Sequence, residues 1–141
     1  MSQPALRAAN DAFYAAFESL DIDRMTDQWA RKANVTCVHP GWDLLIGHEA
    51  VMQSWRGIFE GTREIRFRVE VASIVAGADA GWVLCREILL TTVQGSEVEN
   101  AMTAINTFVL EDGIWRIAHH HASPVLAGRA QRPRPPETLL H

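Results

Sequence analysis

The sequence has few cysteines, no long apolar run and no excess of basic residues. Its two cysteines, Cys37 and Cys85, sit in apolar runs, which predicts small buried side chains rather than a disulfide framework. No run approaches the roughly 18 apolar residues of a membrane span, and the first residues lack a signal-peptide pattern. Thirteen basic and seventeen acidic residues are spread along the chain. We therefore expect a cytoplasmic protein with no membrane or nucleic-acid partner.

Several sequence motifs for common chemistries are also missing. The chain contains no Gly-rich phosphate loop, no nucleophile elbow and no Cys-x-x-Cys pair. Nucleotide cofactors, serine hydrolysis and thiol redox chemistry therefore lack support, and we expect no cofactor. The compositional oddity is histidine, with six residues of which His119, His120 and His121 are consecutive.

The length of 141 residues, with 48% hydrophobic and 21% charged residues, predicts one compact core. We assign residues 1–125 to a single domain. The composition then becomes rich in proline and arginine, which predicts a surface tail over residues 126–141.

Hydrophobic periodicity predicts helices first and strands afterwards. Spacings of three and four indicate helices from Ser2 to about Leu20, from Asp21 or Asp23 toward Ala30, and from His48 to Glu60. Short β-branched or alternating runs indicate strands, at 35–39, 65–71, 82–92, 98–110 and 114–121. This order predicts an α+β fold in which a curved antiparallel sheet forms a cone around three N-terminal helices and leaves a pocket at its open end.

Three segments carry a family resemblance: FYAAFESLDIDRM in the first helices, VTCVHPGWDLLIGHEAV leading into the third helix, and the final strand WRIAHHHASP. With them, residues 5 to 125 resemble the SnoaL-like branch of the nuclear transport factor 2-like superfamily. Its members include ketosteroid isomerase, scytalone dehydratase, limonene epoxide hydrolase and polyketide cyclases, together with non-catalytic binding and association modules. The resemblance thus implies the fold and leaves the activity open.

Three positions can be compared with the isomerase. Its general-base aspartate falls on His39, its oxyanion-hole aspartate on Asn106, and its first-helix tyrosine on Phe13. Phenylalanine cannot donate a hydrogen bond, so the resemblance does not imply steroid isomerisation by the isomerase's route. The chain also lacks an evident Asp-Arg-Asp set of the epoxide hydrolase kind.

The polar candidates for the site are histidines and one amide. By strand alternation His119 and His121 share a face with Trp115 and Ile117, whereas His120 faces the other way. We predict that His39 is a general base near neutral pH and that His121 or His119 acts as acid or orients a substrate. Structural hydrogen bonding of each histidine is the alternative. Zinc binding by the three is a weaker one, and we assign no metal site.

Asn106 shares a strand face with Met102, Ala104 and Phe108. It could polarise a substrate carbonyl or satisfy a neighbouring group, and both readings stay open. The other predicted ligand-binding residues are aromatic, aliphatic or basic: Phe13, Trp42, Trp55, Phe59, Arg86, Met102, Ala104 and His119. We place Arg86 on the inner face with Trp82 and Leu84, which leaves an outer face that carries Ile105, Val109, Val83 and Leu89 as a homodimer surface.

Two functional classes follow. The first is a homodimer that holds a small apolar carbonyl compound and runs cofactor-free isomerisation, dehydration or cyclisation, with His39, Asn106 and His121 as catalytic residues. The second is a non-catalytic module that binds a ligand or associates with a partner. The identity of the ligand does not follow from the residues.

Overall fold

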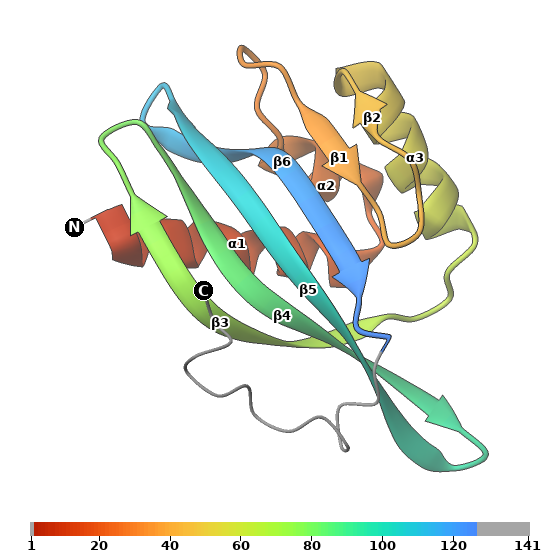
Figure 1. Cartoon of the computed structure of the whole chain (residues 1–141). Helices are drawn as coiled ribbons and strands as arrows, with labels where there is room; N and C mark the ends of the chain where they lie inside the picture. Colours follow the sequence, from red (N-terminus) through yellow and green to blue (C-terminus); the bar gives the residue numbers. More distant parts are fainter. Residues whose placement is uncertain (1, 127–141) are drawn as a thin grey trace.

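The computed structural model describes residues 2–126. Three helices and six strands follow one another: α1 (Ser2–Ser19), α2 (Ile22–Gln28), β1 (Thr36–Val38), β2 (Leu45–Ile46), α3 (His48–Glu60), β3 (Arg66–Ala76), β4 (Ala80–Val93), β5 (Ser96–Glu111) and β6 (Ile114–Pro124). The helices lie against one face of a curved, open sheet (Figure 1). The predicted α+β fold is confirmed. The predicted tail falls almost wholly outside the described residues.

Helix α2 begins where capping chemistry predicts. The Asp21 side chain caps α2 by accepting the backbone N–H groups of Asp23 and Arg24, as short polar side chains do at helix starts. Helix α3 starts after Gly47, whose φ of 99° suits glycine. Helix α1 turns the predicted stripe of Leu6, Phe13 and Phe17 into the core. No helix within residues 2–126 combines the length and apolarity needed to cross a bilayer.

The six strands form one sheet in the order β2-β1-β6-β5-β4-β3. Strands β3 to β6 make the predicted antiparallel meander. The sheet is not antiparallel throughout, because β1 pairs with β6 in parallel. Strand β2 was not predicted, since two residues are too few to show a periodic pattern. The long β4–β5 hairpin extends beyond the body of the molecule (Figure 1).

Two irregularities in strand pairing bend the sheet. The β3–β4 register shifts between Val71 and Ser73, and the β5–β6 register shifts between Thr107 and Phe108. In the second, Thr107 pairs with His119 and Phe108 with Ile117, so Ala118 is an extra residue on β6. Such a bulge reverses the alternation of side chains beyond it. This reversal decides which histidines of β6 face the helices.

Strand β4 turns the face opposite to the predicted one toward the helices. Val83 and Cys85 are buried, whereas Trp82 and Leu84 are exposed on the outer face. Both alternating sets of this strand are rich in apolar residues, so periodicity could not choose between them. The facing of the strand is consistent with the close approach of α1 at Gly81, which points inward. A Cβ at Gly81 would lie 2.7 Å from the Leu6 side chain and 2.4 Å from the Val75 carbonyl oxygen, so only glycine leaves room there.

Candidate active site

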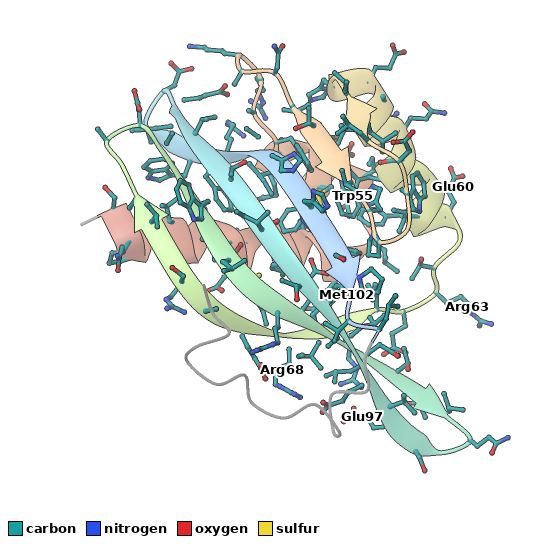
Figure 2. The ribbon with its side chains drawn as sticks, viewed as in Figure 1. Trp55, Glu60, Arg63, Arg68, Glu97 and Met102 are labelled. Carbon is teal, nitrogen blue, oxygen red and sulfur yellow. The ribbon has the colours of Figure 1, made fainter. Side chains whose placement is uncertain are left out.

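A pocket of about 200 Å³ lies between the open side of the sheet and the helices. Aromatic and aliphatic residues make most of its lining: Phe17, Pro40, Trp42, Ile58, Ile65, Phe67, Leu89 and Met102. Its polar lining residues are His39, Glu87 and His120. Figure 2 labels Met102, the lining residue on β5, and Trp55, a buried residue of α3. The volume is below the roughly 300–1,000 Å³ typical of drug-sized ligands, so a small molecule fits best.

Glu87 is a carboxyl group buried in this lining, with only 3% of its surface exposed. The Tyr14 hydroxyl of α1 donates to its Oε2 at 2.5 Å. The nearest histidine nitrogen, His120 Nε2, lies 3.7 Å from the same oxygen. Burial raises the pKa of Glu87 to about 7, although the Tyr14 hydrogen bond lowers it in part. A carboxyl group that exchanges its proton near neutral pH is suited to general acid–base catalysis.

His120, rather than its neighbours, is the histidine of β6 that reaches the pocket. It is 1% exposed, and its Nδ1 lies 2.6 Å from Asn106 Oδ1. The prediction that His119 and His121 face the pocket is therefore wrong, because the extra residue Ala118 reverses the alternation that had grouped them with Ile117. Burial lowers the pKa of His120 well below its usual value, and the other histidines add to this effect. The ring is neutral at pH 7.

His119 and His121 lie instead on the outer face of the sheet. Their ring centroids are 5.7 Å apart. The Nδ1 of His119 lies 2.6 Å from the Thr36 hydroxyl of β1, and His121 is exposed. The catalytic role predicted for His121 and the binding role predicted for His119 thus do not fit their positions.

His39 does line the pocket, at the end of β1. Because the Ser54 hydroxyl donates to the Val51 carbonyl at 2.6 Å, it accepts from His39 Nε2 at 2.9 Å. The proton of neutral His39 is therefore on Nε2. Burial lowers the pKa of His39 to about 4, which contradicts the expectation of a base that titrates near neutral pH. His39 is a neutral polar group beside the ligand space.

Asn106 sits at the centre of a buried hydrogen-bond network. Its Nδ2 donates to Asn10 Oδ1 at 2.9 Å and to the Tyr14 hydroxyl at 3.2 Å. Its Oδ1 is taken by His120. With both ends of the amide occupied by protein groups, Asn106 has no N–H left for a substrate carbonyl. Of the two readings left open by the sequence, the network favours the structural one.

The remaining predicted ligand residues divide into three groups. Trp42 and Met102 line the pocket, and the Trp42 ring lies edge-on to His39 with centroids 4.9 Å apart. Arg86 points outward and pairs with Glu70 at 3.7 Å, because β4 shows its other face to the helices. The rest belong to the buried core, where they support the pocket from behind: Phe13, Trp55, Phe59 and Ala104.

Sequence reasoning missed Glu87 and Tyr14. The available signal was an acidic residue within the apolar run WVLCREILL, since a lone carboxylate in a covered strand needs a buried partner. That partner, Tyr14, is 73 positions away in the chain and could not be found by spacing. Among residues 2–126 no group of three or more His, Cys, Asp or Glu side chains is arranged to hold a metal ion.

Comparison with known proteins places this architecture in a family. The SnoaL-like domain family matches residues 6–127. The chain belongs to the SnoaL-like domain family. This SnoaL-like domain is 31% identical to a proposed dehydratase of the NTF2-like family from Streptomyces avermitilis, with a TM-score of 0.79 over 88% of this chain and 96% of that one. The fold is that of a small-molecule-binding domain.

Two further relatives carry other descriptions. A proposed calcium/calmodulin-dependent protein kinase type II association domain from Thiobacillus denitrificans is 36% identical, with a TM-score of 0.77 over 84% of this SnoaL-like domain and 94% of that chain. The F-box protein SKIP8 of Arabidopsis thaliana is 26% identical over 122 residues, which cover 86% of this chain. The chain spans about half the length of this curated relative.

Proposed function

We propose that this SnoaL-like domain is a cofactor-free acid–base enzyme acting on a small, neutral, largely apolar carbonyl compound, with Glu87 as the group that moves the proton. The observation that carries the proposal is the burial of Glu87 in the pocket lining beside a neutral histidine. A base with a pKa near the working pH combines the correct protonation state with useful proton affinity. The 31% identity to a proposed dehydratase supports this class of reaction.

The composition of the pocket supports a neutral ligand. Among the described residues of its lining none is lysine or arginine, so a ligand carboxylate or phosphate would meet no opposite charge. An anionic ligand would also face the carboxylate of Glu87. Burying an unpaired charge is costly, whereas a neutral ring would bury apolar surface against Phe17, Phe67 and Met102.

The proposed step is the removal of a proton from the carbon next to a carbonyl. The Glu87 carboxylate takes the proton, and the electron pair of the C–H bond moves into the enolate. Glu87 then returns a proton, to the same carbon in exchange, to another carbon in isomerisation, or to a leaving hydroxyl in dehydration. His39 and Trp42 contact the bound compound from the mouth of the pocket.

Hydrogen–deuterium exchange tests this step without knowledge of the natural substrate. In D₂O the protein is expected to accelerate deuterium incorporation next to the carbonyl of small cyclic ketones such as cyclohexanone, followed by proton NMR. The rate should rise between pH 6 and pH 8 as Glu87 loses its proton. Glu87→Gln should reduce the rate by about 100-fold or more, while ligand-observed NMR still detects binding.

Arg86→Gln is the matched control, since it changes the adjacent residue on the outer face and should retain the exchange rate. Binding of the ketones by the wild-type domain with no exchange above solvent would contradict the enzyme proposal. That outcome would favour the non-catalytic binding module.

We also propose that the outer sheet face packs against a second copy of the chain. Its centre carries exposed Trp82 and Leu84 beside half-buried Ile105 and Thr107. The charged groups on that face pair with one another: Arg86 with Glu70 at 3.7 Å, Arg66 with Glu97 at 3.0 Å and Arg68 with Glu99 at 3.0 Å. Two copies could therefore meet through Trp82 and Leu84 while the charged groups of the face stay paired within each copy.

Substitution at the centre of this face tests self-association. Trp82→Glu should convert a dimer into a monomer in sedimentation velocity experiments, because two carboxylates would be buried at the interface. Trp42→Glu, which places the same charge at the pocket mouth, should leave the sedimentation coefficient unchanged. A wild-type monomer at high micromolar concentration would refute the interface.

A further inference from the structure

With the side-chain amides oriented as the structure has them, the contacts of the buried network around Asn106 fix its protons. Asn106 Nδ2 carries two hydrogens, and these go to Asn10 Oδ1 and to the Tyr14 hydroxyl oxygen. Asn106 Oδ1 can only accept, so His120 Nδ1 must carry the proton of their 2.6 Å contact. The neutral ring of His120 then has its lone pair on Nε2, the atom that faces Glu87.

The same assignment orients Tyr14. Because the Tyr14 oxygen accepts from Asn106, its single hydrogen is free for Glu87 Oε2, 2.5 Å away. Glu87 therefore receives one hydrogen bond from Tyr14 and meets a lone pair, not a donor, on the His120 side. The opposite tautomer of His120 would give Glu87 a second donor and weaken it as a base.

We propose, on the basis of the acid–base function above, that Asn106 is the positioning residue of the site: it holds the proton of His120 on Nδ1 and aims the Tyr14 hydroxyl at Glu87. Asn106 itself touches no ligand. Through its two ends it decides which neighbours can donate to the carboxyl group. When Glu87 has taken a proton, the lone pair of His120 Nε2 is an acceptor 3.7 Å from Glu87 Oε2.

Other titratable groups surround the pair, and they bear on its protonation. Cys85 and Tyr14 lie near Glu87, and Cys37 contacts His39 on β1. The charged forms of three histidines would oppose protonation of His120: His39, His119 and His121. None of these groups contacts His120 Nδ1, which Asn106 occupies. A substitution at Asn106 is thus the change that acts directly on the protonation of His120 Nδ1.

Nitrogen-15 NMR of the histidine rings and carbon-13 NMR of the glutamate carboxyl groups test the proposal without a substrate. In the wild-type domain His120 is expected to be neutral and protonated on Nδ1 from pH 6 to pH 8. Asn106→Asp places a carboxylate against Nδ1, so the ring should become doubly protonated at neutral pH. The resulting cation beside Glu87 should lower the pKa of that carboxyl by about 1–3 units.

Asn10→Asp is the matched control. It introduces the same charge at the next residue of the hydrogen-bond network, beyond Asn106 from His120. Asn106 Nδ2 can still donate to that carboxylate. This variant should leave His120 neutral and should not lower the pKa of Glu87. Asn106→Asp is close to isosteric, and the amide of Asn10 can turn to donate to the new carboxylate.

Three outcomes separate this inference from the proposed function. A wild-type His120 protonated on Nε2 would overturn the inference, even if no variant folded. So would a folded Asn106→Asp protein in which His120 and Glu87 titrate as in the wild type. An ordinary pKa for Glu87 in the wild type would instead refute its role as the base, whatever Asn106 does.

Discussion

Replacing Glu87 with glutamine is expected to raise the free energy of unfolding by about 3 kcal/mol at pH 8 and to change it little at pH 4.5. The folded-state pKa of Glu87 is raised from 4.5 to about 7, so the folded protein binds the proton more tightly than the unfolded chain. The carboxyl group therefore costs stability progressively as the pH rises from 4.5 through 7, and the full cost applies above that range. Each unit of pKa difference corresponds to about 1.4 kcal/mol. Glutamine removes the charge and can still accept from Tyr14.

Urea denaturation of both proteins at the two pH values measures this difference. The lowered pKa of His39, about 4, acts in the opposite direction, because stability falls as the pH drops from 6.5 through 4. That loss affects wild type and variant equally and cancels in the comparison. Glu60→Gln, on the exposed side of α3, should show no gain at either pH. An equal gain in the free energy of unfolding for Glu87→Gln at both pH values would mean that burial does not raise the pKa of this carboxyl group.

Replacing Phe13 with alanine should lower the free energy of unfolding by about 3–5 kcal/mol, as is typical for a large buried aromatic side chain. Phe13 is fully buried, and its ring lies 5.0 Å from that of His120 and 5.9 Å from that of Trp55. Its removal opens a cavity at the centre of the core rather than enlarging the ligand pocket. Phe13→Leu fills part of that space and should cost less.

Trp42→Ala provides the contrast, because Trp42 is 47% exposed at the pocket mouth. It should cost about 1 kcal/mol or less in stability while weakening ketone binding. Thermal and urea unfolding, read together with ligand-observed NMR, separate the two effects. Loss of binding without loss of stability in Phe13→Ala would restore the ligand role that the sequence suggested for that residue.

The helices and the meander were predictable because their patterns are local. Helix α3 spans the residues that its apolar spacing indicated, His48 to Glu60, and β3 shows the expected alternation of exposed Arg66 and Arg68 with half-buried Phe67. Asn106 could also be placed on the inner face, since β5 alternates regularly around it. In each case the signal repeats over several residues of one segment.

The site was less predictable because in two strands the alternation of residue types does not show which side chains face the helices. Strand β4 is apolar on both faces, so only packing against α1 shows that Glu87 points inward and Arg86 outward. Strand β6 contains an extra residue whose effect no periodicity reveals. The remaining part of the site, the contact of Tyr14 with Glu87, joins segments far apart in the chain.

The extra residue at Ala118 also matters for comparing relatives of this domain. Where a relative lacks one residue in this segment, a sequence alignment can place the gap at any position within the run of three histidines at equal cost. Each shift of the gap would exchange the interior histidine for one on the outer face. A relative that lacks the extra residue would present a different member of the run to its interior, even with the same three letters in its sequence. The interior histidine of this chain is therefore identified by its strand pairing with Asn106 rather than by its place in the run.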